Sequence, residues 1–172
     1  KDLFGVVTGD GAKLGSPLIQ QVDFLMFTGS TKVGRIVAAQ CGERLIGSAL
    51  ELGGKNAMII RADADIEKAA EIATRACFGN TGQLCVSIER LYVHESIESN
   101  FLEAFVRKTK AMTFQGSVGW GGSYGPLISQ IHAARVLAFI SDAQEKGATI
   151  HAGGELTGNA TIAPTILTGV GE

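Results

Sequence analysis

Short apolar runs alternate with amphipathic stretches along the first third of the chain. Helical spacing is found at residues 12–20 and 31–45, and strand-length apolar runs lie at 4–7, 24–27, 46–52 and 56–60. This alternation predicts an α/β fold in which helices flank open and mostly parallel sheets. On the helix at 31–45, the apolar side chains expected to face the sheet are Val33, Ile36, Val37 and Ala38.

Longer helical patterns follow in the rest of the chain. A helix that ends near residue 78 can be capped by Asp63 or Asp65, because either carboxylate can accept the unpaired amide hydrogens of a first helical turn. A strand is expected at 89–95 and an amphipathic helix at 96–110. The pattern is completed by a glycine-rich loop at 116–126, a helix at 129–146 and strands near 150 and 165.

Composition and charge narrow the function classes. The 172 residues include 45% hydrophobic and 19% charged residues, which is typical of a globular protein with a real core. The formal charge of −2 is mixed along the chain, so we expect no nucleic-acid or membrane partner, and small molecules or other subunits instead. The three cysteines form no CxxC pair and no metal-ligand spacing is found, so we expect no metal and a reduced, cytoplasmic setting.

Both ends of the chain read as interrupted. The sequence begins at Lys1 rather than Met, and residues 4–7 look like a strand already in progress. The last residues, TGVGE, follow directly on the strand-like run near residue 165. We therefore expect a fragment of a longer protein, incomplete at both ends.

Three segments have the composition of functional loops, and each is ambiguous by itself. In FTGSTKVGR, Gly29 and Gly34 can let the start of a helix approach a phosphate, although turn and packing glycines are commoner. In ELGGKN, Glu51 can act as a general base if its loop points into a cleft, although a solvated Glu is commoner at a strand end. The neighbouring Gly53 permits a ligand ring to lie close to the backbone.

The third segment, GNTGQLCVS, places Cys85 after a polar, glycine-containing loop. A cysteine thiolate attacks carbonyl carbons well, and local amides or positive charge increase the thiolate fraction. An isolated loop cysteine is still more often a small buried hydrophobe. Cys41 and Cys77 lie in helical segments, where we expect core positions for both.

Taken together and in this order, FTGSTKVGR, ELGGKN and FGNTGQLCVS closely resemble the aldehyde dehydrogenase superfamily. The similarity extends from VVTGDG near the start to APTIL near the end, and GQLCVSIERLYVHESI further resembles the succinate-semialdehyde dehydrogenase branch. The resemblance implies that residues 1–50 are the C-terminal part of a Rossmann-like dinucleotide-binding domain. Residues 51–172 are then an incomplete catalytic domain that carries the nucleophile.

The resemblance also implies a reaction and a site. Cys85 attacks an aldehyde, hydride leaves the thiohemiacetal for the nicotinamide of NAD or NADP, and Glu51 activates the water that hydrolyses the thioester to an acid. The backbone amide of Cys85 supplies half of an oxyanion hole. The implied cofactor-binding residues are Gly29, Ser30 and Gly34 at the pyrophosphate, Val33 near the adenine, and Leu52 and Gly53 at the nicotinamide.

Other parts of the family's site are expected outside this sequence. In the family, an Asn of the oxyanion hole and a Lys at the cofactor ribose precede the position of Lys1, and a Glu-Ile-Phe-Gly-Pro segment and the arms used for homo-oligomerisation are also missing here. The choice between NAD and NADP and the identity of the aldehyde are therefore left open. We expect that these 172 residues alone do not bind the dinucleotide productively.

Two alternatives stay open on the sequence alone. In a Cys-His thiol hydrolase, Cys85 pairs with His94, His132 or His151, none of which has a recognisable local context. In the second alternative, the chain is a catalytically incompetent fragment of a dehydrogenase. A hydrogen bond between Cys85 and a histidine is the feature that favours the hydrolase.

Overall fold

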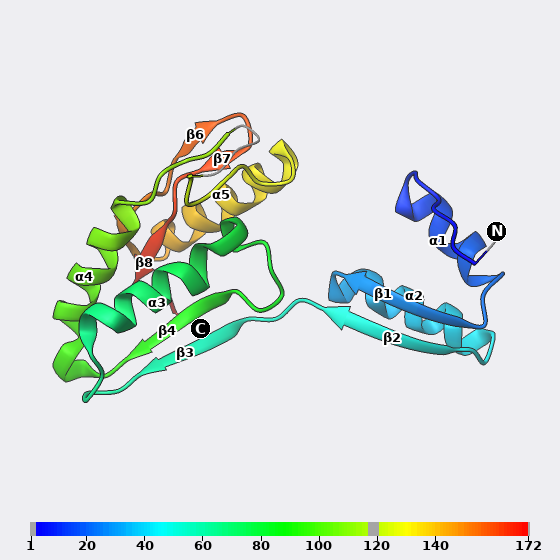
Figure 1. Ribbon diagram of the computed structural model, residues 1–172, viewed down its shortest axis with the longest axis horizontal. Coiled ribbons are helices and arrows are strands. Elements are labelled where there is room, and N and C mark those ends of the chain that lie inside the picture. Colours follow the sequence, from blue (N-terminus) through cyan, green and yellow to red (C-terminus); the bar gives the residue numbers. More distant parts are fainter. Residues whose placement is uncertain (1–2, 117–120, 172) are drawn as a thin grey trace. The chain divides into compact units, whose positions relative to one another are not determined.

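The chain forms two compact units in the computed structural model, which describes residues 3–116 and 121–171 (Figure 1). Unit 1 is Lys1–Gly54 and unit 2 is Lys55–Glu172. Part of the glycine-rich loop expected at 116–126 lies outside the described residues. The functions expected for the two parts of the chain stay predictions.

Unit 1 contains two parallel strands and two helices (Figure 1). Its elements in chain order are α1 (Gly11–Ile19), β1 (Phe24–Gly29), α2 (Thr31–Glu43) and β2 (Gly47–Leu52). Ile19, Val37 and Cys41 are its buried core, so the expected core position of Cys41 is confirmed. The Arg44 guanidinium donates to the carbonyl oxygen of Val22 at 2.7 Å and also to that of Ile19, which fastens the end of α1 to the end of α2.

The helix α2 meets its sheet along a face that overlaps only in part with the expected one: Val37 is buried and Ala38 is half-buried, as predicted. Gly34 and Cys41 are buried, whereas Val33 and Ile36 are 43% and 53% exposed. A Cβ atom at Gly34 would lie 2.6 Å from Leu52 Cδ2, so the missing side chain lets the helix backbone rest on β2. This contact turns Val33 and Ile36 away from the sheet, and the prediction that they face it was wrong.

Residues 4–7 do not form the expected strand. Phe4, Val6 and Val7 are 89%, 74% and 75% exposed, and the segment has no regular structure. A strand needs a neighbour to pair its backbone amide and carbonyl groups, and these residues pair with no strand in the described part of the chain. A short apolar run thus shows that its side chains suit a strand, but it does not show which strand its backbone would pair with.

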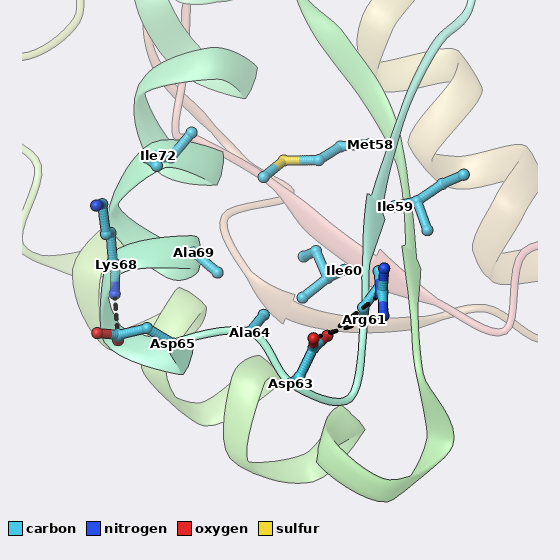
Figure 2. Close-up of a pocket in the computed structure, with 10 residues that line it drawn as sticks. All are labelled: Met58, Ile59, Ile60, Arg61, Asp63, Ala64, Asp65, Lys68, Ala69 and Ile72. Carbon is cyan, nitrogen blue, oxygen red and sulfur yellow. Dashed lines mark hydrogen bonds and ion pairs between the residues drawn. The ribbon is translucent and has the colours of Figure 1, made fainter.

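Unit 2 opens with a second parallel pair, β3 (Asn56–Ile60) and β4 (Ile88–Val93), joined through the helix α3 (Ile66–Phe78). Figure 2 shows the connection between β3 and α3. There the Asp65 carboxylate accepts a hydrogen bond from the backbone amide of Lys68 at 3.1 Å, which confirms one of the two expected caps.

The remaining elements of unit 2 follow the expected order, with two short 3-10 helices and one hairpin in addition. They are η1 (Gly79–Gly82), η2 (Glu95–Ile97), α4 (Glu98–Lys110), α5 (Gln130–Glu145), β5 (Thr149–Ala152), β6 (Leu156–Gly158), β7 (Thr161–Ile162) and β8 (Ile166–Thr168). The pairs β5–β8 and β6–β7 are antiparallel. The hairpin β6–β7 was not predicted, because strands of three and two residues are too short to give an alternating pattern.

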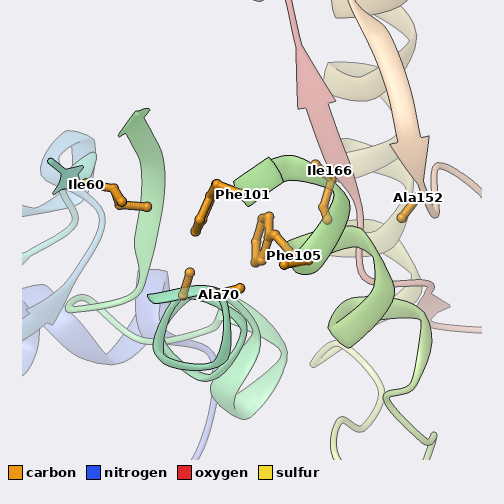
Figure 3. Packing of buried hydrophobic residues seen from close by; sticks show 8 residues of the cluster. Ile60, Ala70, Phe101, Phe105, Ala152 and Ile166 are labelled. Atoms are coloured by element: carbon orange, nitrogen blue, oxygen red, sulfur yellow. The ribbon is translucent and has the colours of Figure 1, made fainter. Parts of the chain in front are cut away.

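The main core of unit 2 is centred on two phenylalanines of α4 (Figure 3). The rings of Phe101 and Phe105 are stacked with centroids 5.6 Å apart, and Phe78 of α3 stacks on Phe105 at 6.0 Å. Ile60 of β3 and Ile166 of β8 belong to the same cluster. The amphipathic pattern predicted for 96–110 is therefore confirmed, and its buried face joins α4 to both the parallel and the antiparallel strands.

Candidate active site

The strands that lead into two of the three candidate segments, β1 and β2, end side by side in unit 1. The parallel strands β1 and β2 are in register, so Gly29 lies opposite Leu52 and Thr28 lies opposite Glu51. The turn after β1 and the glycine pair after β2 therefore leave the sheet at the same carboxyl edge. Open α/β sheets bind their ligands at this edge.

The first turn of α2 offers hydrogen-bond donors at that edge. The Ser30 hydroxyl accepts from the backbone amide of Val33 at 3.3 Å, and the Ser30 carbonyl oxygen accepts from that of Gly34 at 2.8 Å. The amides of Thr31 and Lys32 have no partner within the helix, as is usual in a first turn. These amides, the helix dipole and the exposed Lys32 side chain form a donor set that fits the pyrophosphate of a dinucleotide.

Gly34 and Gly53 differ in their surroundings. Gly34 is buried against the Leu52 side chain, so packing accounts for the glycine at this position. A Cβ atom at Gly53 would meet nothing within 4 Å, which leaves room for a flat ring beside the backbone. Glu51 is exposed next to it, at the end of β2.

Cys85 lies in a tight turn that leads into β4 in unit 2. The backbone amide of Ser87 donates to the carbonyl oxygen of Leu84 at 3.1 Å, which closes the turn around the cysteine. All three cysteines are free, but Cys41 is buried, Cys77 is half-buried and Cys85 is exposed. Burial raises the pKa of the Cys77 thiol to about 11, whereas exposure leaves the Cys85 sulfur open to reagents.

The loop before Cys85 holds two residues in a left-handed conformation. Asn80 has a φ of 51° and Thr81 a φ of 59°, in a region where a β-branched side chain such as that of threonine is strained. The Thr81 hydroxyl donates to the carbonyl oxygen of Gly125 at 3.0 Å and accepts from the backbone amide of Gly125 at 3.1 Å. This double contact offsets the strain and fixes the loop to the segment before α5.

Gln83 makes a second connection to the same segment. Its Nε2 atom donates to the carbonyl oxygen of Pro126 at 3.3 Å and to that of Asn80 at 3.2 Å, and its Oε1 atom accepts from the backbone amide of Ile128 at 2.9 Å. On the other side of the cysteine, Asn56 donates to the carbonyl oxygen of Cys85. These supporting residues were not predicted from the sequence, where their polar character near Cys85 was the only available signal.

None of the histidines contacts the cysteine in the part of the chain that the structure describes. His94 Nδ1 lies 2.9 Å from Ser96 Oγ, and His132 Nδ1 lies 2.9 Å from Ser129 Oγ. His151 Nε2 lies 2.7 Å from Thr168 Oγ1. Each ring has a hydroxyl partner on its own element or its paired strand, which removes the support for a Cys-His thiol hydrolase.

A separate hollow of about 360 Å³ lies between the end of β3 and the start of α3 (Figure 2). It is open to solvent, and its lining includes an exposed ion pair between Arg61 and Asp63, with an N···O distance of 3.2 Å. None of the candidate site residues lines it. The hollow is therefore distinct from the loops that carry the candidate chemistry.

Among the residues that the structure describes, no helix is both long and apolar enough to cross a membrane.

The chain is similar to known proteins over its whole length. The model of the aldehyde dehydrogenase family matches residues 1–172. A protein of Mycolicibacterium smegmatis with the provisional name succinate-semialdehyde dehydrogenase, NADP(+), is 45% identical over 99% of this chain and 34% of its own length. The chain thus spans about a third of the length of the curated relatives it matches.

Two solved structures give the same result for the fold. The succinate-semialdehyde dehydrogenase of Burkholderia pseudomallei has a TM-score of 0.90 and 35% identity, covering 96% of this chain and 35% of its own. The glyceraldehyde-3-phosphate dehydrogenase of Methanocaldococcus jannaschii, solved with NADP, has a TM-score of 0.88 and 36% identity, covering 94% of this chain and 35% of its own. The predicted α/β class with open parallel sheets is therefore confirmed.

Proposed function

Because this chain belongs to the aldehyde dehydrogenase family, we propose that it carries the nucleophile and part of the cofactor site of an enzyme that oxidises an aldehyde to a carboxylic acid. The observation that carries this proposal is the exposed Cys85, set in a turn that is hydrogen-bonded on both sides. A structural cysteine has no need of an exposed position or of such support.

Cys85 performs the first chemical step in this proposal. Its thiolate sulfur forms a bond to the aldehyde carbon, and the carbonyl oxygen becomes an oxyanion that accepts a hydrogen bond from the Cys85 backbone amide. Leu52 and Gly53 would hold the nicotinamide of NAD or NADP, which would supply the hydride acceptor needed to convert this adduct into a thioester. Glu51 then takes a proton from a water molecule, whose oxygen attacks the thioester and releases the acid and the Cys85 thiolate.

The cofactor-binding roles are assigned to the carboxyl edge of unit 1. Gly29, Ser30 and the first amides of α2 bind the pyrophosphate, and the exposed Val33 side chain contacts the adenine. Gly34 acts by letting α2 approach β2. Leu52 and Gly53 border the nicotinamide ring, since the backbone at Gly53 has open space beside it.

The substrate proposed is succinate semialdehyde. This substrate is supported by the provisional name of the Mycolicibacterium smegmatis relative and by the name of the Burkholderia pseudomallei structure. NADP is named for that relative and in the Methanocaldococcus jannaschii complex, which favours NADP over NAD. The cytoplasmic location and the homo-oligomeric full-length protein stay predictions.

Ester hydrolysis tests the assignment of the nucleophile without any cofactor. We expect a burst of p-nitrophenol from p-nitrophenyl acetate, lost in Cys85→Ala and retained in Cys41→Ala and Cys77→Ala. Glu51→Gln should keep the burst and slow the steady phase that follows. Equal loss in all three cysteine variants would contradict the assignment. Reduction of NADP by the 172-residue chain with succinate semialdehyde, at the turnover of a complete enzyme, would contradict the expected incompetence of the chain alone.

A further inference from the structure

The side chain of Asn56 binds the turn that carries Cys85. Its Nδ2 atom donates to the carbonyl oxygen of Cys85 at 2.6 Å and to the carbonyl oxygen of Ser87 at 3.0 Å. A primary amide nitrogen has two hydrogens, so each carbonyl oxygen can receive one of them. The side chain thus bridges two peptide groups of one turn.

Asn56 lies where the pairing of β3 with β4 is irregular, next to a buried part of the turn. Asn56 is half-buried and Ser87 is only 3% exposed, so the hydrogen bond to Ser87 is partly shielded from water, whereas the hydrogen bond to Cys85 is exposed. The strand ladder is irregular at the same point, because Asn56 pairs with Ile88 whereas Ala57 pairs with Arg90. Where the regular backbone pairing is interrupted, the Asn56 side chain connects β3 to the chain before β4.

We propose that Asn56 is a positioning residue, which holds the Cys85 turn in the geometry needed for attack on a carbonyl group; this rests on the nucleophilic role proposed for Cys85. A fixed carbonyl oxygen sets the ψ angle of Cys85 and hence the direction of its Cα–Cβ bond. The bond from Ser87 to Leu84 fixes the preceding half of the turn. The Cβ atom and the backbone amide of Cys85 are then held in one arrangement, and the sulfur extends from that fixed Cβ atom.

Two reagents separate this role from a general loosening of the protein. With p-nitrophenyl acetate, the Cys85 sulfur bonds to the acetyl carbon, the C–O bond breaks, p-nitrophenolate leaves and the thiol proton passes to solvent. The tetrahedral intermediate carries an oxyanion that needs the aligned Cys85 amide. With iodoacetamide, an S–C bond forms, the C–I bond breaks, iodide leaves and the thiol proton passes to solvent, and no oxyanion develops.

Asn56→Asp is the most informative variant, because it keeps the size of the side chain and replaces the donor by a carboxylate that repels both carbonyl oxygens. We expect the acylation rate to fall about 10- to 100-fold and the iodoacetamide rate to change by less than about threefold. Asn56→Ser, whose hydroxyl can donate to one oxygen only, should show an intermediate loss of acylation. If Asn56→Asp does not fold, the ratio of the acylation rate to the alkylation rate in Asn56→Ser tests the positioning role instead.

Asn100 supplies the matched control, since it is an exposed asparagine on α4 of the same unit. Asn100→Asp should leave both rates unchanged. Unchanged acylation in the Asn56 variants, or an equal fall of acylation and alkylation, overturns the positioning role alone. Absence of Cys85 acylation in the unsubstituted chain overturns the proposed function and this inference together.

Discussion

The Oε1 atom of Gln83 accepts a hydrogen bond from the backbone amide of Ile128 at 2.9 Å, across 45 positions of the sequence. Gln83 lies two residues before the candidate nucleophile, and Ile128 lies just before α5. The loop of the cysteine is therefore tied to a distant segment by side-chain contacts. The geometry of this loop therefore depends on contacts with residues that are distant in the sequence.

Gln83→Glu should slow acylation of Cys85 without unfolding the chain. The glutamate keeps an acceptor for the Ile128 amide but loses the two donors and places a charge near the carbonyl oxygens of Asn80 and Pro126. The burst rate with p-nitrophenyl acetate measures the effect. Gln144→Glu, at an exposed site on α5, serves as the control, and equal rates in the two variants would disprove the role of Gln83.

Thr81 should tolerate serine but not valine. Serine keeps both hydrogen bonds to Gly125 and removes a methyl group that is strained at a φ of 59°. Valine keeps the branched shape and leaves the Gly125 carbonyl and amide groups without their partner, at a cost of about 1–2 kcal/mol in the free energy of unfolding. Urea denaturation of Thr81→Ser and Thr81→Val compares the two directly, and similar stabilities would refute the prediction.

Two glycines of α2 should respond oppositely to alanine. At Gly34 the new Cβ atom would lie 2.6 Å from Leu52 Cδ2, so we expect a loss of about 1–3 kcal/mol in unfolding free energy. At Gly42 it would meet nothing within 4 Å, and alanine should stabilise by about 0.5–1 kcal/mol. Thermal unfolding distinguishes the two. The double variant Gly34→Ala and Leu52→Ala should regain part of the loss, and a purely additive result would speak against their contact.

Alkylation should discriminate between the two cysteines of unit 2. Burial penalises the thiolate of Cys77 and raises the pKa of its thiol to about 11. At pH 8 this lowers the thiolate fraction of Cys77 by roughly 100-fold relative to a free thiol. Iodoacetamide followed by peptide mass spectrometry should therefore label Cys85 first. Cys77 should react as the pH approaches 11 or after unfolding, and early labelling of Cys77 at pH 8 would count against its burial.

Elements with strong local signals could be predicted from the sequence. The cap Asp65 and the buried face with Phe101 and Phe105 depend on residues within one helix, and both were found as expected. The orientation of α2 could not be predicted, because it is set by the contact of Gly34 with Leu52 on another element.

The candidate site divides in the same way. The three segments with Gly29, Glu51 and Cys85 were identified by their order and wording, and their roles stay predictions. The bonds from Asn56 and Gln83 to distant backbone groups were not foreseen, because single polar residues give no indication of their partners. Only the folded chain shows which carbonyl and amide groups lie within reach.

The in-register pairing of Gly29 with Leu52 also explains the spacing between two of the motifs. A helix of 13 residues such as α2 rises by about 20 Å, and a strand of six residues such as β2 advances by a similar roughly 20 Å. The helix α2 therefore brings the chain from the end of β1 back to the start of β2, over a length that matches the length of β2. An insertion of one full turn into α2 would lengthen this path by about 5 Å, so that β2 would have to slide or the added turn loop out. The number of residues between the Gly29 and Leu52 motifs is thus determined by the geometry of α2 and β2 rather than by chemistry.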